Sequence, residues 1–416
     1  MTPRFPSPVP AMKQLLAALS ICLFALPIRA AEPFELKDGD RVVWLGNTLI
    51  EREQRYGYWE TALTARWPDR KIRFRNLGWS GDTVYGDARV AFDLDKPGIG
   101  LKRMVELTLA EKPTVIFICY GTNESFEGDA GMEKFKKGYE KLLDELKPAA
   151  ARVVLITPIP FEPRPKMNAL ATNMNKHLAA YRDVIDDVAK RKSLVLADLF
   201  SRISKRENES ALTDNGLHLT AYGYWTMQRE LLAALNLDGV PPPEISLEEG
   251  RVKATEADAV IVDGGRVALD VRLAHLPRIL APRNDDPLER FSLRWPANPR
   301  LRARGLPEGK YLLRIDGHTE PIPTLARELA KGVNLRLEAD LDQVEQLRQA
   351  IVAKNQLYFY RWRPQNETYL FGFRKHEQGQ NAKEVPEFDP LVEKREAEIA
   401  KLRVPTPHTY ELMPVK

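Results

Sequence analysis

Four polar stretches of the sequence carry residue types that could together hydrolyse an ester. Thr48 lies in "GNTLIE", Gly81 in "GWSGDT", Asn123 in "YGTNES" and His218 in "LTDNGLHLT". Ester hydrolysis requires a hydroxyl beside a general base and hydrogen-bond donors where the oxyanion develops. Thr48 offers the hydroxyl and His218 the base, while the Gly81 amide and the Asn123 side chain offer the donors. The chemistry follows only if the fold brings these residues together.

The elements that must position them are five short apolar runs. These runs are "RVVWL" (41–45), "IRFRNL" (72–77), "TVIFIC" (114–119), "RVVLI" (152–156) and "LVLAD" (194–198). All but the second are nearly continuously apolar, as expected for strands that are buried on both faces. Between the later runs, apolar residues such as Phe135, Tyr139 and Leu142 recur at helical spacing. The alternation predicts a three-layer α/β sandwich around a five-stranded parallel sheet.

In such a sheet, ligands bind outside the carboxyl ends of the strands. The Thr48, Gly81 and Asn123 stretches each follow one of the apolar runs directly, and the His218 stretch lies beyond the last of them. The predicted topology therefore places all four at one edge of the sheet.

The ordered set of stretches resembles the SGNH or GDSL hydrolase family over roughly residues 38–236. The resemblance implies a flavodoxin-like SGNH fold and a role for each residue. Thr48 takes the place of the nucleophilic serine of the family's Gly-Asp-Ser block. Gly81 and Asn123 match the oxyanion donors, and His218 matches the general base.

Two positions depart from the family's pattern. Threonine keeps the hydroxyl at position 48, but its extra methyl group restricts χ1. The residue three positions before His218 is Asn215, where the family has the aspartate that orients the base. The equivalent change in a serine protease lowers kcat about 10⁴-fold. Asp214 could replace the missing carboxylate by a shift of one residue, or a backbone carbonyl could orient the ring.

Two functions of different classes fit these residues. The first is an ester hydrolase that removes acetyl groups from a carbohydrate, with a small-molecule or carbohydrate ester as substrate. The second is a catalytically degenerate protein that uses the same pocket to bind a glycan or another ligand. Retention of Gly81, Asn123 and His218 favours the first, whereas the changes at Thr48 and Asn215 favour the second.

Other polar groups near the predicted strand ends have simpler interpretations. Ser80 is a second hydroxyl, but in the resembling family this serine is usually structural. Glu51, Asp82 and Glu124 are interpreted as solvated or helix-capping carboxylates. The histidines show no metal-ligand spacing, and "GTNESFEG" lacks the lysine of a phosphate-binding loop, so no cofactor or metal is expected.

The N-terminus predicts export. Basic residues precede the apolar run "LLAALSICLFALPI", and small residues near Ala30 and Ala31 suit cleavage, so residues 1–31 read as a signal peptide. The expected location is the periplasm or the extracellular space. Cleavage removes three basic residues and lowers the formal charge from +4 to +1, which gives no basis for binding nucleic acid or a membrane surface. Cys119 is then the single cysteine, so an intramolecular disulfide is excluded.

The rest of the chain divides by composition. Residues 36–237 form the predicted α/β domain, residues 245–320 a β-rich module, and residues 321–416 a helical, aromatic region that could pack on the α/β domain. The segment 355–381 mixes Tyr, Phe, Trp and Arg. It predicts either a carbohydrate-facing or interface surface, or aromatic side chains that complete the core.

Overall fold

The computed structural model describes most of the chain. The described residues are 1, 34–90, 95–165, 167–206, 210–237, 244–248, 251–253, 256–262, 266–282, 300–317, 321–335, 338–377, 379 and 381–415. The proposed signal peptide falls almost entirely outside these residues. Among the helices of the described part, none is both long enough and apolar enough to cross a membrane.

A five-stranded, all-parallel sheet forms the centre of the first half, which confirms the predicted fold class. Its strands are β1 (Arg41–Gly46), β2 (Arg73–Asn76), β3 (Val115–Cys119), β4 (Arg152–Ile156) and β5 (Val195–Ala197). Their order in the sheet is β2-β1-β3-β4-β5. The first strand pairs with both β2 and β3, so the turns after these three strands lie next to one another.

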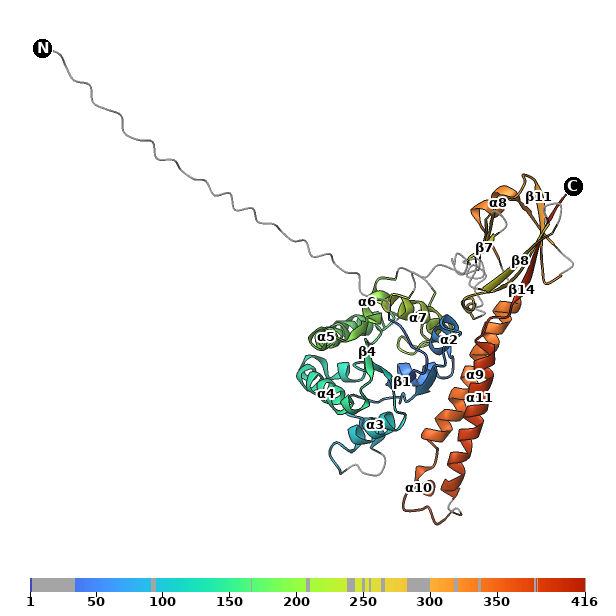
Figure 1. The fold of residues 1–416 in the computed structure, drawn as a ribbon. Coiled ribbons are helices and arrows are strands. Elements are labelled where there is room, and N and C mark those ends of the chain that lie inside the picture. Colours follow the sequence, from blue (N-terminus) through green and yellow to red (C-terminus); the bar gives the residue numbers. More distant parts are fainter. Residues whose placement is uncertain are drawn as a thin grey trace. The chain divides into compact units, whose positions relative to one another are not determined.

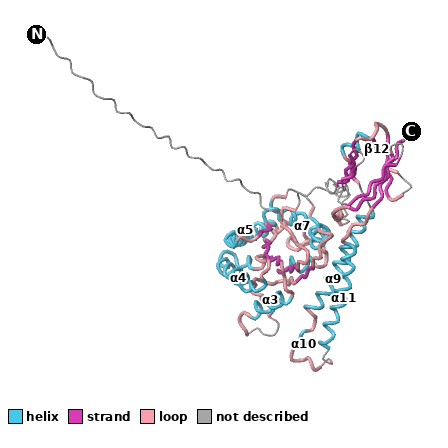
Figure 2. The backbone as a smooth tube through the Cα atoms, viewed as in Figure 1, coloured by secondary structure: helices cyan, strands magenta, loops and turns pink. Residues whose placement is uncertain are grey.

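Helices cover both faces of this sheet, seen around the strands in Figure 2. They are α1 (Thr48–Glu53), α2 (Tyr58–Arg66), α3 (Ile99–Ala110), α4 (Met132–Glu145), α5 (Asn168–Lys192), α6 (Leu199–Ser204) and α7 (Ala221–Ala234). Successive side chains of β1 point to opposite faces of the sheet. Trp44 packs on the face covered by α2 and α7, and Val43 packs on the face covered by α3, α4 and α5. Burial on both faces explains the continuous apolar character of the strands.

Two further sheets follow, in accord with the predicted β-rich part. Their strands are β6 (Glu244–Glu248), β7 (Arg251–Lys253), β8 (Glu256–Val262), β9 (Arg266–Arg272), β10 (Arg300–Arg304), β11 (Lys310–Ile315), β12 (Ile322–Leu325), β13 (Val333–Asn334) and β14 (His408–Pro414). One sheet has the order β13-β10-β6-β7 and the other β12-β11-β14-β9-β8. The last strand of the chain therefore lies in the middle of a sheet whose other members are far away in sequence.

A pair of long helices forms the helical tail. They are α9 (Glu338–Trp362) and α11 (Phe388–Leu402), joined through α10 (Glu367–Leu370), and they run side by side in Figure 1. The first of them also packs against the α/β domain, where the buried Lys354 binds Glu60 at 2.6 Å and the Phe74 carbonyl at 3.2 Å. This contact covers β2, the edge strand that would otherwise expose unpaired backbone groups.

A buried histidine ties this helix pair to the last sheet. His408 on β14 contacts Asp316 through Nδ1 at 2.6 Å and Asp340 through Nε2 at 2.9 Å. Because both ring nitrogens face carboxylates, the imidazolium form is favoured. The hydrogen bond with Asp340, supported by that with Asp316, raises the pKa of His408 to about 9.

This pKa predicts a loss of stability in mild alkali. The folded-state pKa lies above the ordinary value of 6.5, so the stabilisation is complete below pH 6.5 and disappears as the pH rises through 9. The loss is at most about 3 kcal/mol, and less because solvent screens the partly exposed Asp316. Unfolding free energies measured between pH 6 and 9.5 should show this slope, and His408→Gln should flatten it. An equal slope in both proteins would contradict the assignment.

Candidate active site

The turn after β1 is built for close packing and presents Thr48 at the start of α1. A Cβ on Gly46 would lie 2.6 Å from the Cys119 carbonyl oxygen on β3, so no larger residue fits there without a shift. Asn47 is the N-cap, since its side-chain oxygen accepts a hydrogen bond from the Leu49 amide at 3.1 Å. The next residue, Thr48, is thereby fixed at the end of the strand.

The turn after β2 brings Gly81 to this hydroxyl. The Gly81 N–H donates to Thr48 Oγ1 at 3.2 Å, and Gly81 adopts a left-handed φ of +79°. The same turn lies directly on α1, since a Cβ on Gly78 would come 2.3 Å from the Glu51 amide nitrogen. Two glycines therefore permit the close approach that places a backbone donor on the candidate nucleophile.

Asn123 follows β3 and contributes a second donor. Its Nδ2 donates to the Asp82 carbonyl oxygen at 2.7 Å, which fixes the side chain against the Gly81 turn. An amide nitrogen carries two N–H groups, so one remains for a ligand.

The loop before α7 places Asn215 on His218. The Asn215 Oδ1 atom accepts hydrogen bonds from the Leu217 amide at 3.1 Å and the His218 amide at 2.9 Å. Its Nδ2 atom lies 2.9 Å from His218 Nδ1. The two backbone donors fix the orientation of the side-chain amide, because reversing it would set NH₂ against both of them.

This arrangement selects one tautomer of the neutral His218 ring. Since Asn215 Nδ2 donates to Nδ1, Nδ1 must accept, and the ring proton lies on Nε2. A general base of the serine-hydrolase type needs the opposite tautomer, with Nε2 free to accept the hydroxyl proton. The family has an aspartate where this chain has Asn215. Asn215 orients the His218 ring, but it favours the tautomer whose proton is on Nε2, the nitrogen that a base needs unprotonated.

Asp214 is directed elsewhere. Its carboxylate pairs with Arg52 at 3.3 Å, and its backbone amide donates to the His218 carbonyl oxygen at 2.9 Å. Burial lowers the pKa of His218, and the positive charge of Arg52 lowers it further, while Asp214 opposes both effects. The ring is therefore neutral at pH 7, as a base must be.

Candidate residues from three of the four sequence stretches meet at one cavity. Thr48, Asn123, His218 and Arg52 contribute to its wall, and the remaining lining residues are Asn47, Leu49, Thr122, Ile159, Leu217, Leu219 and Tyr224. Within the described chain no hydrogen bond joins Thr48 to the His218 ring, although both face this cavity. Catalytic hydrogen bonds are often long in free enzymes and tighten in the complex.

The interpretation of the nearby acids as solvated groups was wrong for all three. Glu51, Asp82 and Glu124 are buried. Asp82 forms a fully buried ion pair with Arg89 at 2.7 Å and accepts a hydrogen bond from the Tyr120 hydroxyl at 3.0 Å. These two contacts of Asp82 hold the turn that carries Gly81 against the core of the domain.

Glu124 and Glu51 connect the strand-end turns to one another. Glu124 accepts hydrogen bonds from the Val84 amide at 2.8 Å and the Gly121 amide at 2.9 Å, and burial raises its pKa to about 7. Glu51 accepts from the Ser80 amide at 2.8 Å and the Ser80 hydroxyl at 2.9 Å. One sequence feature indicates that these carboxylates are buried. They lie within the stretches that follow the strands, where the turns pack closely against one another.

The aromatic segment 355–381 divides between its two interpretations. Tyr358 is buried and donates a hydrogen bond to Glu111, whereas Phe371 and Phe373 are 57% and 75% exposed. Its first part therefore completes the core, and its second part presents apolar surface.

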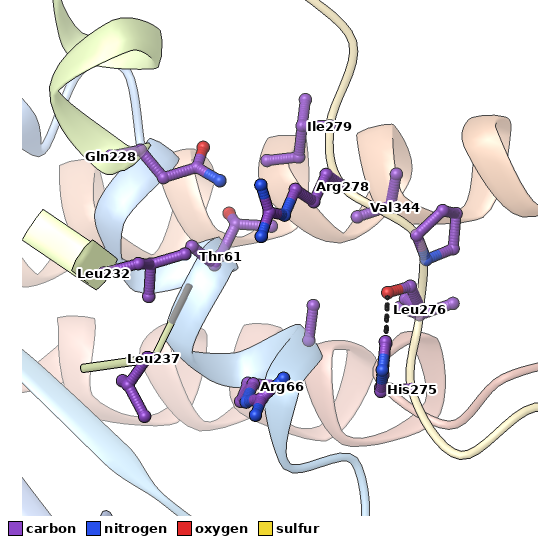
Figure 3. A pocket seen from close by; sticks show the side chains of 13 residues that line it. Thr61, Arg66, Gln228, Leu232, Leu237, His275, Leu276, Arg278, Ile279 and Val344 are labelled. Atoms are coloured by element: carbon purple, nitrogen blue, oxygen red, sulfur yellow. Dashed lines mark hydrogen bonds between the residues drawn. The ribbon is translucent and has the colours of Figure 1, made fainter. Parts of the chain in front are cut away.

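A second cavity lies between α2, α7 and α9 (Figure 3). Its wall includes Arg66, Arg278 and His275. Burial and the charge of Arg278 lower the pKa of Arg66. Thr61 supplies a hydroxyl, but this donates to the Gly57 carbonyl oxygen at 2.6 Å. The cavity therefore lacks a free nucleophile, and it is not the candidate acyl-transfer site.

In the described part of the chain, no group of three or more His, Cys, Asp or Glu is placed to hold a metal ion.

Comparison with known proteins confirms the resemblance drawn from the sequence. Residues 39–226 match the GDSL-like Lipase/Acylhydrolase family. Among solved structures, the chain is similar to BT4096, a gut microbial diltiazem-metabolizing enzyme, with 18% identity, a TM-score of 0.67, and coverage of 92% of this chain and 99% of that chain. It is also similar to Axe2, an acetylxylan esterase from Geobacillus stearothermophilus, with 20% identity, a TM-score of 0.38, and coverage of 49% and 96%. No curated protein matches this sequence.

Proposed function

Because residues 39–226 match the GDSL-like lipase and acylhydrolase family, we propose that this chain is an exported esterase that removes acetyl groups from carbohydrates. Thr48 is the nucleophile, His218 the general base, and the Gly81 N–H and Asn123 Nδ2 form the oxyanion hole. The observation that carries the proposal is the hydrogen bond from Gly81 N to Thr48 Oγ1 at 3.2 Å, because it places an oxyanion donor directly beside the hydroxyl.

The reaction proceeds through an acyl-enzyme. In the minor tautomer of His218, whose ring proton lies on Nδ1, Nε2 takes the hydroxyl proton as Thr48 Oγ1 attacks the acetyl carbon, and the carbonyl oxygen becomes an oxyanion held by Gly81 and Asn123. The C–O bond to the sugar breaks as His218 returns the proton to the leaving alkoxide. Water, deprotonated by the same ring, then attacks the acetyl-Thr48 ester and releases acetate and the free hydroxyl.

The lining of the cavity suits a short acyl group, and an exposed aromatic side chain lies close along the chain to it. Its apolar wall, which includes Leu49 and Ile159, is small, as suits an acetyl methyl group. Close along the chain to lining residues lie Phe126, which is 60% exposed, and Phe161, which packs against it edge to face at 6.1 Å. An exposed aromatic face of this kind suits stacking on a sugar ring. The apolar N-terminal segment supports export.

A second candidate function is ligand binding without catalysis, and the Asn215 hydrogen bonds favour it specifically. With its proton on Nε2, His218 presents a donor to the cavity that Asn123 also lines. Such a pocket binds oxygen-rich ligands such as glycans without any proton transfer.

A covalent probe distinguishes the two functions. We expect a fluorophosphonate to modify Thr48, because the hydroxyl attacks phosphorus as it attacks an ester, and tryptic mass spectrometry should find the adduct on the Thr48 peptide. Acetate release from p-nitrophenyl acetate and an acetylated polysaccharide should accompany labelling. An adduct on Ser80 would overturn the Thr48 assignment, and neither adduct nor acetate release would favour the binding function.

A further inference from the structure

The side chain of Arg363 connects the C-terminal helix region to the candidate active site. Arg363 follows the last residue of α9, and its backbone amide still donates to the Phe359 carbonyl oxygen at 2.9 Å. Its guanidinium NH1 donates to Glu51 Oε2 at 2.6 Å, although the two residues are 312 positions apart. Glu51 is buried, one helical turn after Thr48.

Glu51 joins the two turns on which the oxyanion hole depends. It belongs to α1, as Thr48 does, and it binds both the amide and the hydroxyl of Ser80. The next residue, Gly81, donates to the Thr48 hydroxyl. The orientation of the Gly81 N–H is therefore set by the Glu51 carboxylate, through the residue immediately before it.

The guanidinium of Arg363 is held in place on its other side. It stacks over the Trp79 ring at 3.7 Å, a distance at which the cation–π attraction is substantial. Trp79 in turn packs edge to face on Trp362 at 5.7 Å. Arg363 thus contacts the Gly81 turn twice, directly at Trp79 and through Glu51 at Ser80.

We infer that Arg363 is a positioning residue for the oxyanion hole, supplied to the α/β domain by the C-terminal helices. The expected effect of Arg363 on kcat rests on the proposed esterase function. Its expected effect on the Ser80–Gly81 backbone does not. Without the guanidinium, the buried Glu51 carboxylate loses its cationic partner and Trp79 loses the nearer of two guanidinium groups over its ring, the other being that of Arg89 at 5.3 Å. Either change releases the Ser80–Gly81 backbone from its alignment with Thr48.

Kinetics in an Asn215→Asp background test the catalytic consequence. We expect Arg363→Met to lower kcat about 10- to 100-fold with KM changed less than about twofold, because an oxyanion donor acts on the transition state. Arg363→Lys should recover part of kcat, since it restores the charge but not the planar stacking group. The matched control is Arg361→Met, which removes an arginine that binds the exposed Asp389 at 2.8 Å, and it should leave kcat unchanged.

Hydrogen exchange tests the structural consequence without any need for activity. Amides of the peptide that contains Ser80 and Gly81 should exchange faster in Arg363→Met, while those of β3 keep their protection, and Arg361→Met should match the parent. If Arg363→Met does not fold, Arg363→Lys carries both measurements, with smaller effects of the same sign.

The outcomes separate the two claims. Equal exchange and equal kcat in Arg363→Met and Arg361→Met would overturn the inference. So would a loss of kcat that merely follows the folded fraction, with faster exchange throughout the chain. If Asn215→Asp shows no hydrolysis at all, the proposed esterase function fails, and the exchange result alone decides the role of Arg363.

Discussion

Replacing Asn215 by aspartate should raise kcat for p-nitrophenyl acetate by about 10³- to 10⁴-fold, the reverse of the loss seen when a triad aspartate becomes asparagine. In the native protein, the Asn215 oxygen accepts two backbone amides and its nitrogen faces His218 Nδ1 at 2.9 Å. An aspartate keeps the two backbone contacts and places an acceptor on Nδ1. The proton then moves to Nδ1, Nε2 becomes a base, and the carboxylate stabilises the imidazolium.

The tautomer can be measured independently of the rate. Nitrogen chemical shifts of the His218 ring should report the Nε2–H form in the native protein and the Nδ1–H form in Asn215→Asp. Asp214→Asn is the matched control, because it alters the neighbouring carboxylate, which pairs with Arg52, and it should change kcat only a few-fold. A large loss in Asp214→Asn, with no gain in Asn215→Asp, would show that Asp214 is the orienting acid.

The positions of the candidate site residues were predictable because they depend on local patterns. Apolar runs of four to six residues identify strands buried on both faces, and the order of the runs determines a parallel sheet. That topology brings Thr48, Gly81 and Asn123 to one edge without any knowledge of side-chain contacts. His218, beyond the last strand, was predictable from its place in the ordered set of stretches.

Contacts between distant segments were not predictable in the same way. Nothing near Glu51 in the sequence indicates that Arg363 neutralises it, because the pairing depends on how α9 packs along β2. The interpretation of Glu51 as solvated was wrong for this reason. The orientation of the Asn215 amide was equally hidden, since it depends on two backbone donors that only the folded loop presents. The sequence pattern thus predicts where the candidate reacting groups lie, but not which partners set their protonation and alignment.

Thr48→Ala should reduce kcat by about 10³-fold or more in the Asn215→Asp background, leaving only the catalysis that the oxyanion donors and binding supply. The reason is specific to a nucleophile: without Oγ no acyl-enzyme can form, whatever the state of His218. Thr48→Ser should instead raise kcat by roughly tenfold, equivalent to about 1.4 kcal/mol, because it keeps the hydroxyl and removes the methyl group that restricts χ1 and crowds the tetrahedral stage.

Ser80→Ala is the matched control for Thr48→Ala. Its hydroxyl is also at this edge of the sheet, but it donates to Glu51 at 2.9 Å, so its removal should leave acyl transfer in place and affect kcat far less. Burst kinetics with p-nitrophenyl acetate should show acyl-enzyme accumulation in Ser80→Ala and none in Thr48→Ala. Undiminished turnover in Thr48→Ala would remove threonine from the mechanism, and it would leave a water molecule activated by His218 as the attacking group, with Gly81 and Asn123 still holding the oxyanion.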